Sequence, residues 1–287
     1  MSAGARTPRT WPAPAKLNLF LHIIGRRPDG YHELQTCFQF VDLCDEVTIL
    51  AREDGAIRRG AGAAGVEPGQ DLCVRAALAL QAATGTRRGA DISVLKRIPM
   101  GAGLGGGSSD AATCLVALNR LWDLNLPVDE LAALGLKLGA DVPVFVRGRA
   151  AWAEGVGERL TPLYPPLAPE EHNYLIIKPN VFVSTRDVFQ DPELTRNTPP
   201  ITIHGFLATG GRNDCLAVVR RRYPEVARAL DWLSTYGAAR LTGTGACIFM
   251  ACEPGPARKI AGNLPAGYEA FVVRGLNDSP LLVRSTA

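Results

Sequence analysis

The chain has 287 residues, which predicts roughly two domains at a typical size of about 150 residues each. Hydrophobic residues make up 47% and charged residues 21%, proportions that exclude a disordered chain, a collagen and a coiled coil. The 31 Lys and Arg residues exceed the 28 Asp and Glu residues by three, and the sequence contains no run of five like charges. We therefore expect small-molecule partners rather than a nucleic acid or a membrane surface, and the charge pattern leaves the oligomeric state open.

Three further features concern location and metal binding. The longest apolar stretch, residues 17–24, is shorter than the ~18 residues of a membrane span, and no signal-peptide cleavage pattern follows it. The seven cysteines contain no C-x-x-C pair and the four histidines contain no H-x-x-x-H pair, which argues against structural zinc and a disulfide framework. We expect a cytoplasmic protein without a metal site of its own.

Hydrophobic periodicity predicts the elements of the first half of the chain. Residues 51–69 are rich in Gly and Ala and predict a loop or an irregular hairpin, and residues 27–30 predict a turn. Strands are predicted over residues 16–24, 37–41, 47–50 and 91–98. Helices are predicted over residues 71–83, 108–122 and a segment that carries Leu131, Leu134 and Leu138 and ends at Gly139.

The second half also mixes both kinds of element. Residues 161–171 are rich in Pro and Leu with little periodicity, so we place a domain boundary there, between residues 1–163 and 164–287. The predicted strands are 174–177, 240–241, 246–250 and 270–274, and the predicted helices are one stretch from Cys215 towards Leu233 and one near 257–261. The predicted fold class is therefore α+β in two domains.

A glycine-rich loop at residues 101–109 is the strongest local signal, because it lies between a predicted strand and a predicted helix. Consecutive glycines let backbone N–H groups approach a phosphate at a helix N-terminus, and Ser108 and Ser109 add hydroxyls. The alternative is a flexible linker with a serine helix cap, but linkers rarely occupy such a position. The Walker lysine, the protein-kinase signatures and the second strand of a dinucleotide fold are all missing.

Three segments resemble the GHMP kinase superfamily in order and spacing: residues 14–18, 99–110 and 241–247. Two more, residues 28–32 and 139–145, fit one branch better than the rest, the kinases of 4-diphosphocytidyl-2-C-methyl-D-erythritol. The resemblance runs from about Trp11 to near the C-terminus. It implies an N-terminal nucleotide-binding domain like the second domain of ribosomal protein S5, a ferredoxin-like C-terminal domain, and a site between them.

The resemblance also implies a reaction, the transfer of the γ-phosphoryl group of ATP to the 2-hydroxyl of the erythritol unit. The products would be the 2-phosphate and ADP, in the non-mevalonate route to isoprenoid precursors, with Mg²⁺ expected alongside the nucleotide. Asp141 matches the general base of this branch, and Lys16 matches its charge partner. From the residues alone, Asp141 could instead cap the helix before Pro143, and Lys16 could be a solvated charge.

The remaining site residues are assigned by the same resemblance. Tyr31 would stack on the cytosine, His32 would hydrogen-bond it, and Phe189 would form the second stacking face, although a lone aromatic residue can simply lie in the core. Lys96 would lie near the adenosine, with a strand-edge lysine as the alternative. The implied nucleotide residues are Lys96, Pro99, Met100, Gly101, Ala102, Gly103, Leu104, Gly105, Gly106, Gly107, Ser108 and Ser109. The implied acceptor residues are Asn18, Tyr31, His32, Thr185 and Phe189.

The roles of Asp71 and of residues 242–245 remain open, and so do two alternative functions. Asp71 stands where relatives often have Asn, so it either meets the adenine amino group or caps the following helix. Residues 242–245 are a plain hairpin or a turn against the phosphates and the acceptor. The alternative functions are another GHMP kinase of the mevalonate or homoserine type, against which Tyr31 and His32 argue, and a catalytically silent nucleotide sensor, against which Lys16 and Asp141 argue.

Overall fold

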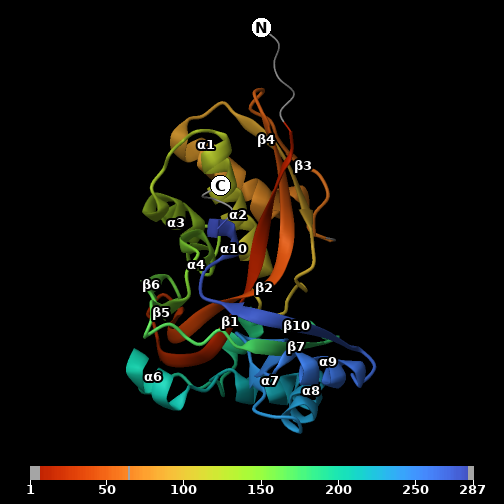
Figure 1. Cartoon of the computed structure of the whole chain (residues 1–287). Coiled ribbons are helices and arrows are strands. Elements are labelled where there is room, and N and C mark those ends of the chain that lie inside the picture. Colours follow the sequence, from red (N-terminus) through yellow and green to blue (C-terminus); the bar gives the residue numbers. More distant parts are fainter. Residues whose placement is uncertain (1–6, 64, 284–287) are drawn as a thin grey trace.

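The computed structural model describes residues 7–63 and 65–283, so the outer ends of the predicted domains, residues 1–6 and 284–287, lie outside the described residues. Figure 1 shows two parts, one with the first strands and helices of the chain and one with β7, β10 and the helices α6 to α9 packed beneath it. Each part contains helices and strands, which confirms the α+β prediction.

Two long antiparallel strands, β1 (Arg9–Arg26) and β2 (His32–Arg52), form the centre of the first part. The predicted turn at residues 27–30 joins them. β2 also pairs with β4 (Gly89–Leu95), β5 (Ala151–Gly155) and β10 (Tyr268–Leu276), and the last pairing joins the sheets of the two parts. The other strands are β3 (Ile57–Arg59), β6 (Arg159–Pro162), β7 (Asn173–Pro179), β8 (Arg240–Leu241) and β9 (Ile248–Ala251).

The helices of the first part lie on one face of its sheet, as Figure 1 shows. They are α1 (Leu72–Thr84), α2 (Gly106–Leu121), α3 (Val128–Leu136) and α4 (Val142–Arg147), and a short 3₁₀ helix, Pro68–Gln70, precedes α1. Their apolar faces pack on buried residues of β1, β2 and β4 in one core. The predicted helices of this half are confirmed, with shifts of about two residues at their ends.

The second part is an antiparallel sheet in the order β10, β7, β9, β8, packed against three helices. These helices are α7 (Leu216–Arg222), α8 (Pro224–Ser234) and α9 (Pro254–Gly262). The predicted single helix from Cys215 towards Leu233 is wrong, because Pro224 has no N–H to continue a helix and instead starts a new one after Tyr223. The prediction also missed α5 (Thr185–Gln190), α6 (Ile203–Thr209) and α10 (Pro280–Val283).

The expectation of a loop or hairpin over residues 51–69 is wrong in part, because β3 lies in this segment and pairs in parallel with β4. The two strands predicted at residues 37–41 and 47–50 are one continuous strand, β2, with a shift of register near Pro14 and Cys44. The polar residues between them hid this continuity, since they interrupt the apolar pattern that predicts strands.

The two parts share buried residues. A third cluster of buried side chains contains Leu17 and Phe20 of β1, Trp152 of β5 and Phe249 of β9, so it lies between the other two cores. Leu21 and Ile23, at the far end of β1, pack in the core of the second part. Residues 163–172 form neither helix nor strand, and we propose that the domain boundary lies in this stretch even though β1 contributes to both cores.

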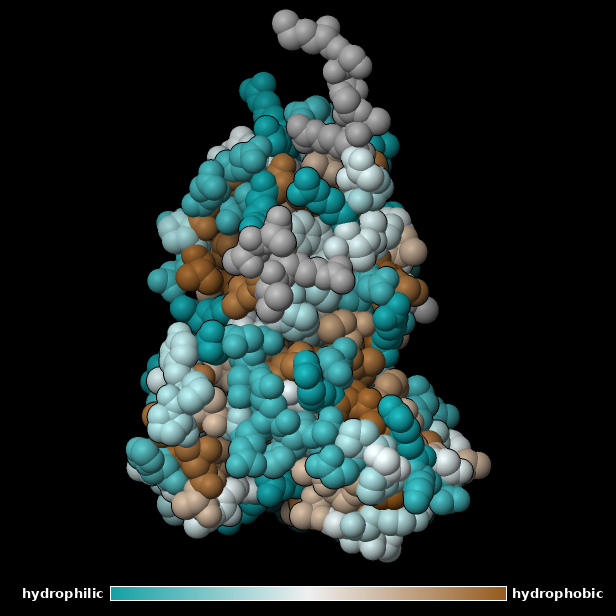
Figure 2. Space-filling view, viewed as in Figure 1, coloured by the Kyte–Doolittle hydropathy of each residue, from teal (hydrophilic) through white to brown (hydrophobic). Residues whose placement is uncertain are grey.

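No helix within residues 7–63 and 65–283 combines the length and the apolar character needed to cross a membrane. On the face shown in Figure 2, hydrophilic side chains predominate and hydrophobic ones lie in scattered patches.

Asp214 ties β1 to the second part, and its removal should destabilise the protein. Its buried carboxylate accepts hydrogen bonds from Ile23 N (2.7 Å), Thr198 Oγ1 (2.6 Å) and Arg212 Nε (2.7 Å). We expect Asp214→Ala to lower the free energy of unfolding by about 3 kcal/mol or more, because buried donors lose a charged acceptor. Urea unfolding followed by circular dichroism measures this change.

The matched control is Asp231→Ala, because Asp231 pairs with Arg220 at the surface and is 62% exposed. An exposed ion pair contributes about 1 kcal/mol or less, so the unfolding midpoint should hardly move. Equal shifts in the two variants would show that Asp214 does not hold the two parts together.

Candidate active site

A cavity of about 710 Å³ lies where the glycine loop meets the second part. Of the predicted nucleotide residues, all except Ser109 line it, and the Ser109 side chain is fully buried. Asn18, Thr185 and Phe189 line it from the acceptor set, whereas Tyr31 and His32 do not. Lining residues that the sequence did not indicate include Thr36 and Phe38 of β2, Val156, Gly157 and Asp110.

The glycine loop owes its shape to positions that only glycine adopts easily. Gly101, Gly103 and Gly105 have φ values of 62°, 74° and 73°, in the left-handed region. At Gly103 there is also no space, because a Cβ atom would lie 2.4 Å from the carbonyl oxygen of Thr242. The turn at residues 242–245 therefore contacts the glycine loop directly, a contact that the plain-hairpin alternative does not require.

The first turn of α2 offers backbone donors to the cavity. The helix begins without a side-chain cap, and its first backbone hydrogen bond runs from Ser109 N to Gly105 O. The amides of Gly106, Gly107 and Ser108 precede that bond, and all three residues line the cavity. Free amides at a helix N-terminus bind anions well, so the arrangement suits a phosphate group.

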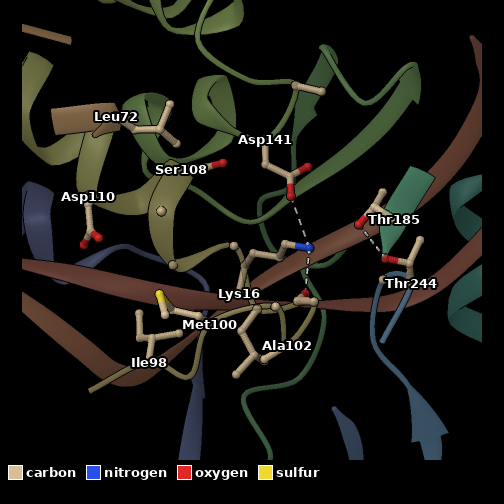
Figure 3. A pocket seen from close by; sticks show the side chains of 18 of the residues that line it. Lys16, Leu72, Ile98, Met100, Ala102, Ser108, Asp110, Asp141, Thr185 and Thr244 are labelled. Carbon is tan, nitrogen blue, oxygen red and sulfur yellow. Dashed lines mark hydrogen bonds and ion pairs between the residues drawn. The ribbon is translucent and has the colours of Figure 1, made fainter. Parts of the chain in front are cut away.

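Lys16 of β1 and Asp141 point toward each other across the cavity, as Figure 3 shows, with Nζ and Oδ2 3.4 Å apart. Lys16 Nζ also donates to Asn18 Oδ1 (2.5 Å) and to Gly103 O (3.0 Å). The lysine is buried, while the Asp141 side chain is 33% exposed. Asp141 precedes α4 but its side chain makes no capping hydrogen bond, so the capping alternative does not describe it.

Asn18 holds Lys16 in place. Its Nδ2 donates to Thr36 Oγ1 (3.0 Å), which directs its Oδ1 toward Lys16. Its backbone N–H donates to Thr242 Oγ1 (2.9 Å) in the turn of the second part. Within that part, Thr185 and Thr244 share a hydrogen bond of 3.0 Å at the cavity wall.

Lys96 is not a solvated lysine at a strand edge, because it lies between two buried carboxylates. Its Nζ donates to Asp45 and to Asp110 Oδ2, the latter at 2.6 Å. Asp45 also accepts the backbone N–H groups of Arg97 (2.5 Å) and Ile98 (2.8 Å). Since Lys96 precedes the glycine loop and Asp110 follows it, this cluster joins the two ends of the loop.

The charges of this cluster are not fully balanced, because one lysine faces two carboxylates. Burial raises the pKa of Asp110 to about 7, and the nearby Lys96 opposes that rise. The sequence did not indicate Asp45 or Asp110 as partners of Lys96. The available signal was Asp110 itself, a carboxylate on the otherwise apolar and small-residue face of α2.

The structure brings together two of the three residues predicted to hold a cytosine. His32 stacks on Phe189 with ring centroids 5.2 Å apart and an angle of 28° between the rings. Tyr31 is 64% exposed, and within the described residues no ring contact joins it to Phe189. Arg196 donates to His32 Nε2 at 3.0 Å, a contact that the sequence did not indicate. The sandwich of Tyr31 and Phe189 therefore stays a prediction.

Asp71 caps α1, which confirms the second of its two alternatives. One carboxylate oxygen accepts from Cys73 N (2.9 Å) and the other accepts from Arg59 Nε (2.6 Å). Both oxygens are therefore engaged, although the residue also lines the cavity.

Comparison with known proteins gives consistent results. Two family models match, the GHMP kinases N terminal domain over residues 71–149 and GHMP kinases C terminal over residues 205–270. A 4-diphosphocytidyl-2-C-methyl-D-erythritol kinase of Ectopseudomonas mendocina (strain ymp) is 58% identical, over 94% of this chain and 92% of that protein. A relative of the same name from Alkalilimnicola ehrlichii is 56% identical, over 96% and 94%.

Solved structures agree with this fold. A crystal structure of 4-(cytidine 5'-diphospho)-2C-methyl-D-erythritol kinase superimposes with a TM-score of 0.79 at 35% identity, and the match covers 93% of this chain and 99% of that one. A mevalonate kinase superimposes with a TM-score of 0.70 at 16% identity, which shows a common fold alone.

The contact at Gly103 predicts a large effect of adding one methyl group. We expect Gly103→Ala to weaken ATP binding about tenfold or more, because a Cβ at positive φ is strained and also displaces the turn at residue 242. Isothermal titration with ATP measures the affinity, and circular dichroism checks the fold.

Gly262→Ala is the control, since a Cβ there would have no atom within 4 Å and the backbone is not left-handed. This variant should bind ATP like the wild type. Wild-type ATP affinity in a folded Gly103→Ala protein would contradict the assignment of the loop.

Proposed function

The chain belongs to the GHMP kinases and, within them, to the 4-diphosphocytidyl-2-C-methyl-D-erythritol kinases, and from this membership we propose that it transfers the γ-phosphoryl group of ATP to the 2-hydroxyl of 4-diphosphocytidyl-2-C-methyl-D-erythritol. The products are the 2-phosphate and ADP, in the non-mevalonate route to isoprenoid precursors. The fold alone does not select this acceptor, because mevalonate kinase shares it at 16% identity. Relatives at 58% and 56% identity support the choice.

The nucleotide site that we propose is the glycine loop with the first turn of α2. The amides of Gly106, Gly107 and Ser108 would hold the phosphates, and the partial positive charge of the helix N-terminus would add to their attraction. Lys96 acts here mainly by fixing the ends of the loop, since its Nζ is already bound by two carboxylates.

Mg²⁺ would enter with the nucleotide. Within the described ranges, no three His, Cys, Asp or Glu side chains gather into a metal-binding group, so the ion would rely on the phosphates for most of its ligands. Ser108, at the start of α2 and lining the cavity, would add a hydroxyl oxygen to those ligands. The ion would neutralise charge on the phosphates.

The Lys16–Asp141 pair is the observation that carries the proposed chemistry. Phosphoryl transfer needs positioning and charge neutralisation more than covalent catalysis by the protein. Asp141 would accept the proton of the acceptor hydroxyl, and Lys16 would stabilise both the carboxylate and the charge of the transferred group. Lys16 also donates to Gly103 O in the glycine loop, so the reacting oxygen and the phosphates would meet at this end of the cavity.

The acceptor would occupy the side of the cavity formed by β1, β2 and α5. Phe189 and Thr185 line this side, and the ring of His32 stacks on that of Phe189. Tyr31 would close on the base from the exposed turn, and Asn18 would face the polyol while it holds Lys16.

Substitution at the ion pair should separate chemistry from binding. We expect Asp141→Asn to lower kcat about 100-fold or more while ATP affinity stays within a few fold, because the amide keeps the shape but cannot take a proton. Lys16→Met should also lower kcat. If the two residues act as a unit, the double variant should be little worse than either single variant.

Steady-state ADP release at saturating ATP and acceptor measures kcat. Asp129→Asn is the matched control, because Asp129 is 77% exposed and pairs with Arg147 away from the cavity. Near-wild-type turnover in Asp141→Asn would remove this residue from the mechanism.

A panel of acceptors tests the substrate. With Mg-ATP, ADP should appear with the cytidine-diphosphate-linked acceptor and not with methylerythritol phosphate, mevalonate, homoserine or galactose. Equal turnover of free methylerythritol phosphate would refute cytosine recognition.

Substitution of Tyr31 tests the stacking contact. Tyr31→Ala should raise the KM for the acceptor by about 10-fold to 100-fold with little change in kcat, since stacking of one base on an aromatic ring contributes about 1–3 kcal/mol. Tyr236→Ala, on the helical side of the second part, is the control and should leave this KM unchanged.

A further inference from the structure

One side chain, Arg196, binds both aromatic residues on the acceptor side of the cavity. Its Nε donates to His32 Nε2 (3.0 Å), and its Nη2 donates to Phe189 O (3.0 Å) and to Asp191 O (2.7 Å). Its Nη1 donates to Leu194 O (3.1 Å). Four donors of a rigid, planar group are thus engaged, so the position of the guanidinium is closely defined.

The contact with His32 decides which ring nitrogen carries the proton. A guanidinium only donates hydrogen bonds, so His32 Nε2 must accept, and in a neutral ring the proton is then on Nδ1. Burial, followed by the charges of Arg196 and Arg26, lowers the pKa of His32, which favours the neutral ring. Within the described residues, no hydrogen bond occupies Nδ1.

The same contact fixes the plane of the ring. His32 is buried, and its ring centroid lies 5.2 Å from that of Phe189. Arg196 donates both to the ring of His32 and to the backbone carbonyl of Phe189. The two residues are 157 positions apart in sequence, and Arg196 links them.

We propose that Arg196 is a positioning residue for acceptor recognition, which fixes His32 as a hydrogen-bond donor through Nδ1 and holds its ring against Phe189. The inference rests on the proposed function, in which His32 and Phe189 hold the base of the acceptor. A donor at this place complements a pyrimidine whose N3 accepts, as in cytosine. It opposes one whose N3 carries a hydrogen, as in uracil. Arg196 therefore contributes to the choice between these two bases.

The first measurement needs no substrate. Nitrogen-15 NMR of the histidine rings, with His32 assigned by comparison with His32→Gln, should show an Nδ1–H ring in the wild-type protein at pH 8, where a histidine of lowered pKa is neutral. In Arg196→Met, the Nε2–H form should appear and the pKa of His32 should rise toward 6.5, because one positive charge is gone. A wild-type ring protonated on Nε2 would overturn the proposal directly.

The second measurement is kinetic. In Arg196→Met, the KM for the cytidine-linked acceptor should rise about 10-fold to 100-fold, because a charged hydrogen bond is lost, while kcat and the KM for ATP stay within about two-fold. The ratio of kcat/KM for the cytidine-linked over the uridine-linked acceptor should fall. Arg196→Lys keeps the charge and one donor, and it should recover part of both losses.

Arg220→Met is the matched control, since Arg220 pairs with Asp231 on the surface of the second part. An unchanged KM and an unchanged cytidine-to-uridine ratio in a folded Arg196→Met protein would overturn the proposal. If the wild-type protein fails to phosphorylate the cytidine-linked acceptor, the proposed function fails instead, and the tautomer of His32 still reports on Arg196 alone.

Discussion

The close approach of the turn at residues 242–245 to Gly103 is the constraint on which the rest of the site depends. A Cβ on Gly103 would lie only 2.4 Å from the carbonyl oxygen of Thr242, and the backbone N–H of Cys247 donates to Ala102 O at 3.1 Å. This contact joins the glycine loop of the first part to the hairpin of the second. Lys16 in turn donates to Gly103 O, so the cation of the site is positioned from the same residue. The loop, the hairpin and β1 thus define one edge of the cavity together.

Buried charge gives this edge its rigidity. Lys16 is held by Asn18, Gly103 and Asp141, and Lys96 is held by two carboxylates. Removing ions from water is costly, and these contacts offset that cost only because each donor has a defined acceptor. A site arranged in this way needs little reorganisation as charge develops on the transferred phosphoryl group. The nucleotide side of the cavity is therefore organised before either substrate binds.

Local sequence predicted the elements that depend on local physics. Helical periodicity predicted α1, α2 and α3, and the run of glycines predicted the loop, in which the structure has Gly101, Gly103 and Gly105 in the left-handed region. The Lys96 cluster was missed because Asp45 and Lys96 are 51 positions apart, and nothing in either segment indicates the other. Arg196 was missed for the same reason, since His32 is 164 positions away. Asp141 and Lys16 came from resemblance to a family, because their pairing across the cavity has no local signature.

The acceptor side is organised differently from the nucleotide side. His32 and Phe189 are held by Arg196, but Tyr31 lies on an exposed turn. Ordering such a side chain on binding costs conformational entropy, so part of the interaction energy of the acceptor is spent on closing the site. A ring that is already fixed, as His32 is, adds specificity without that cost. In the proposed function, the fixed His32 would therefore discriminate among bases, while the exposed Tyr31 would contribute mainly to the strength of binding.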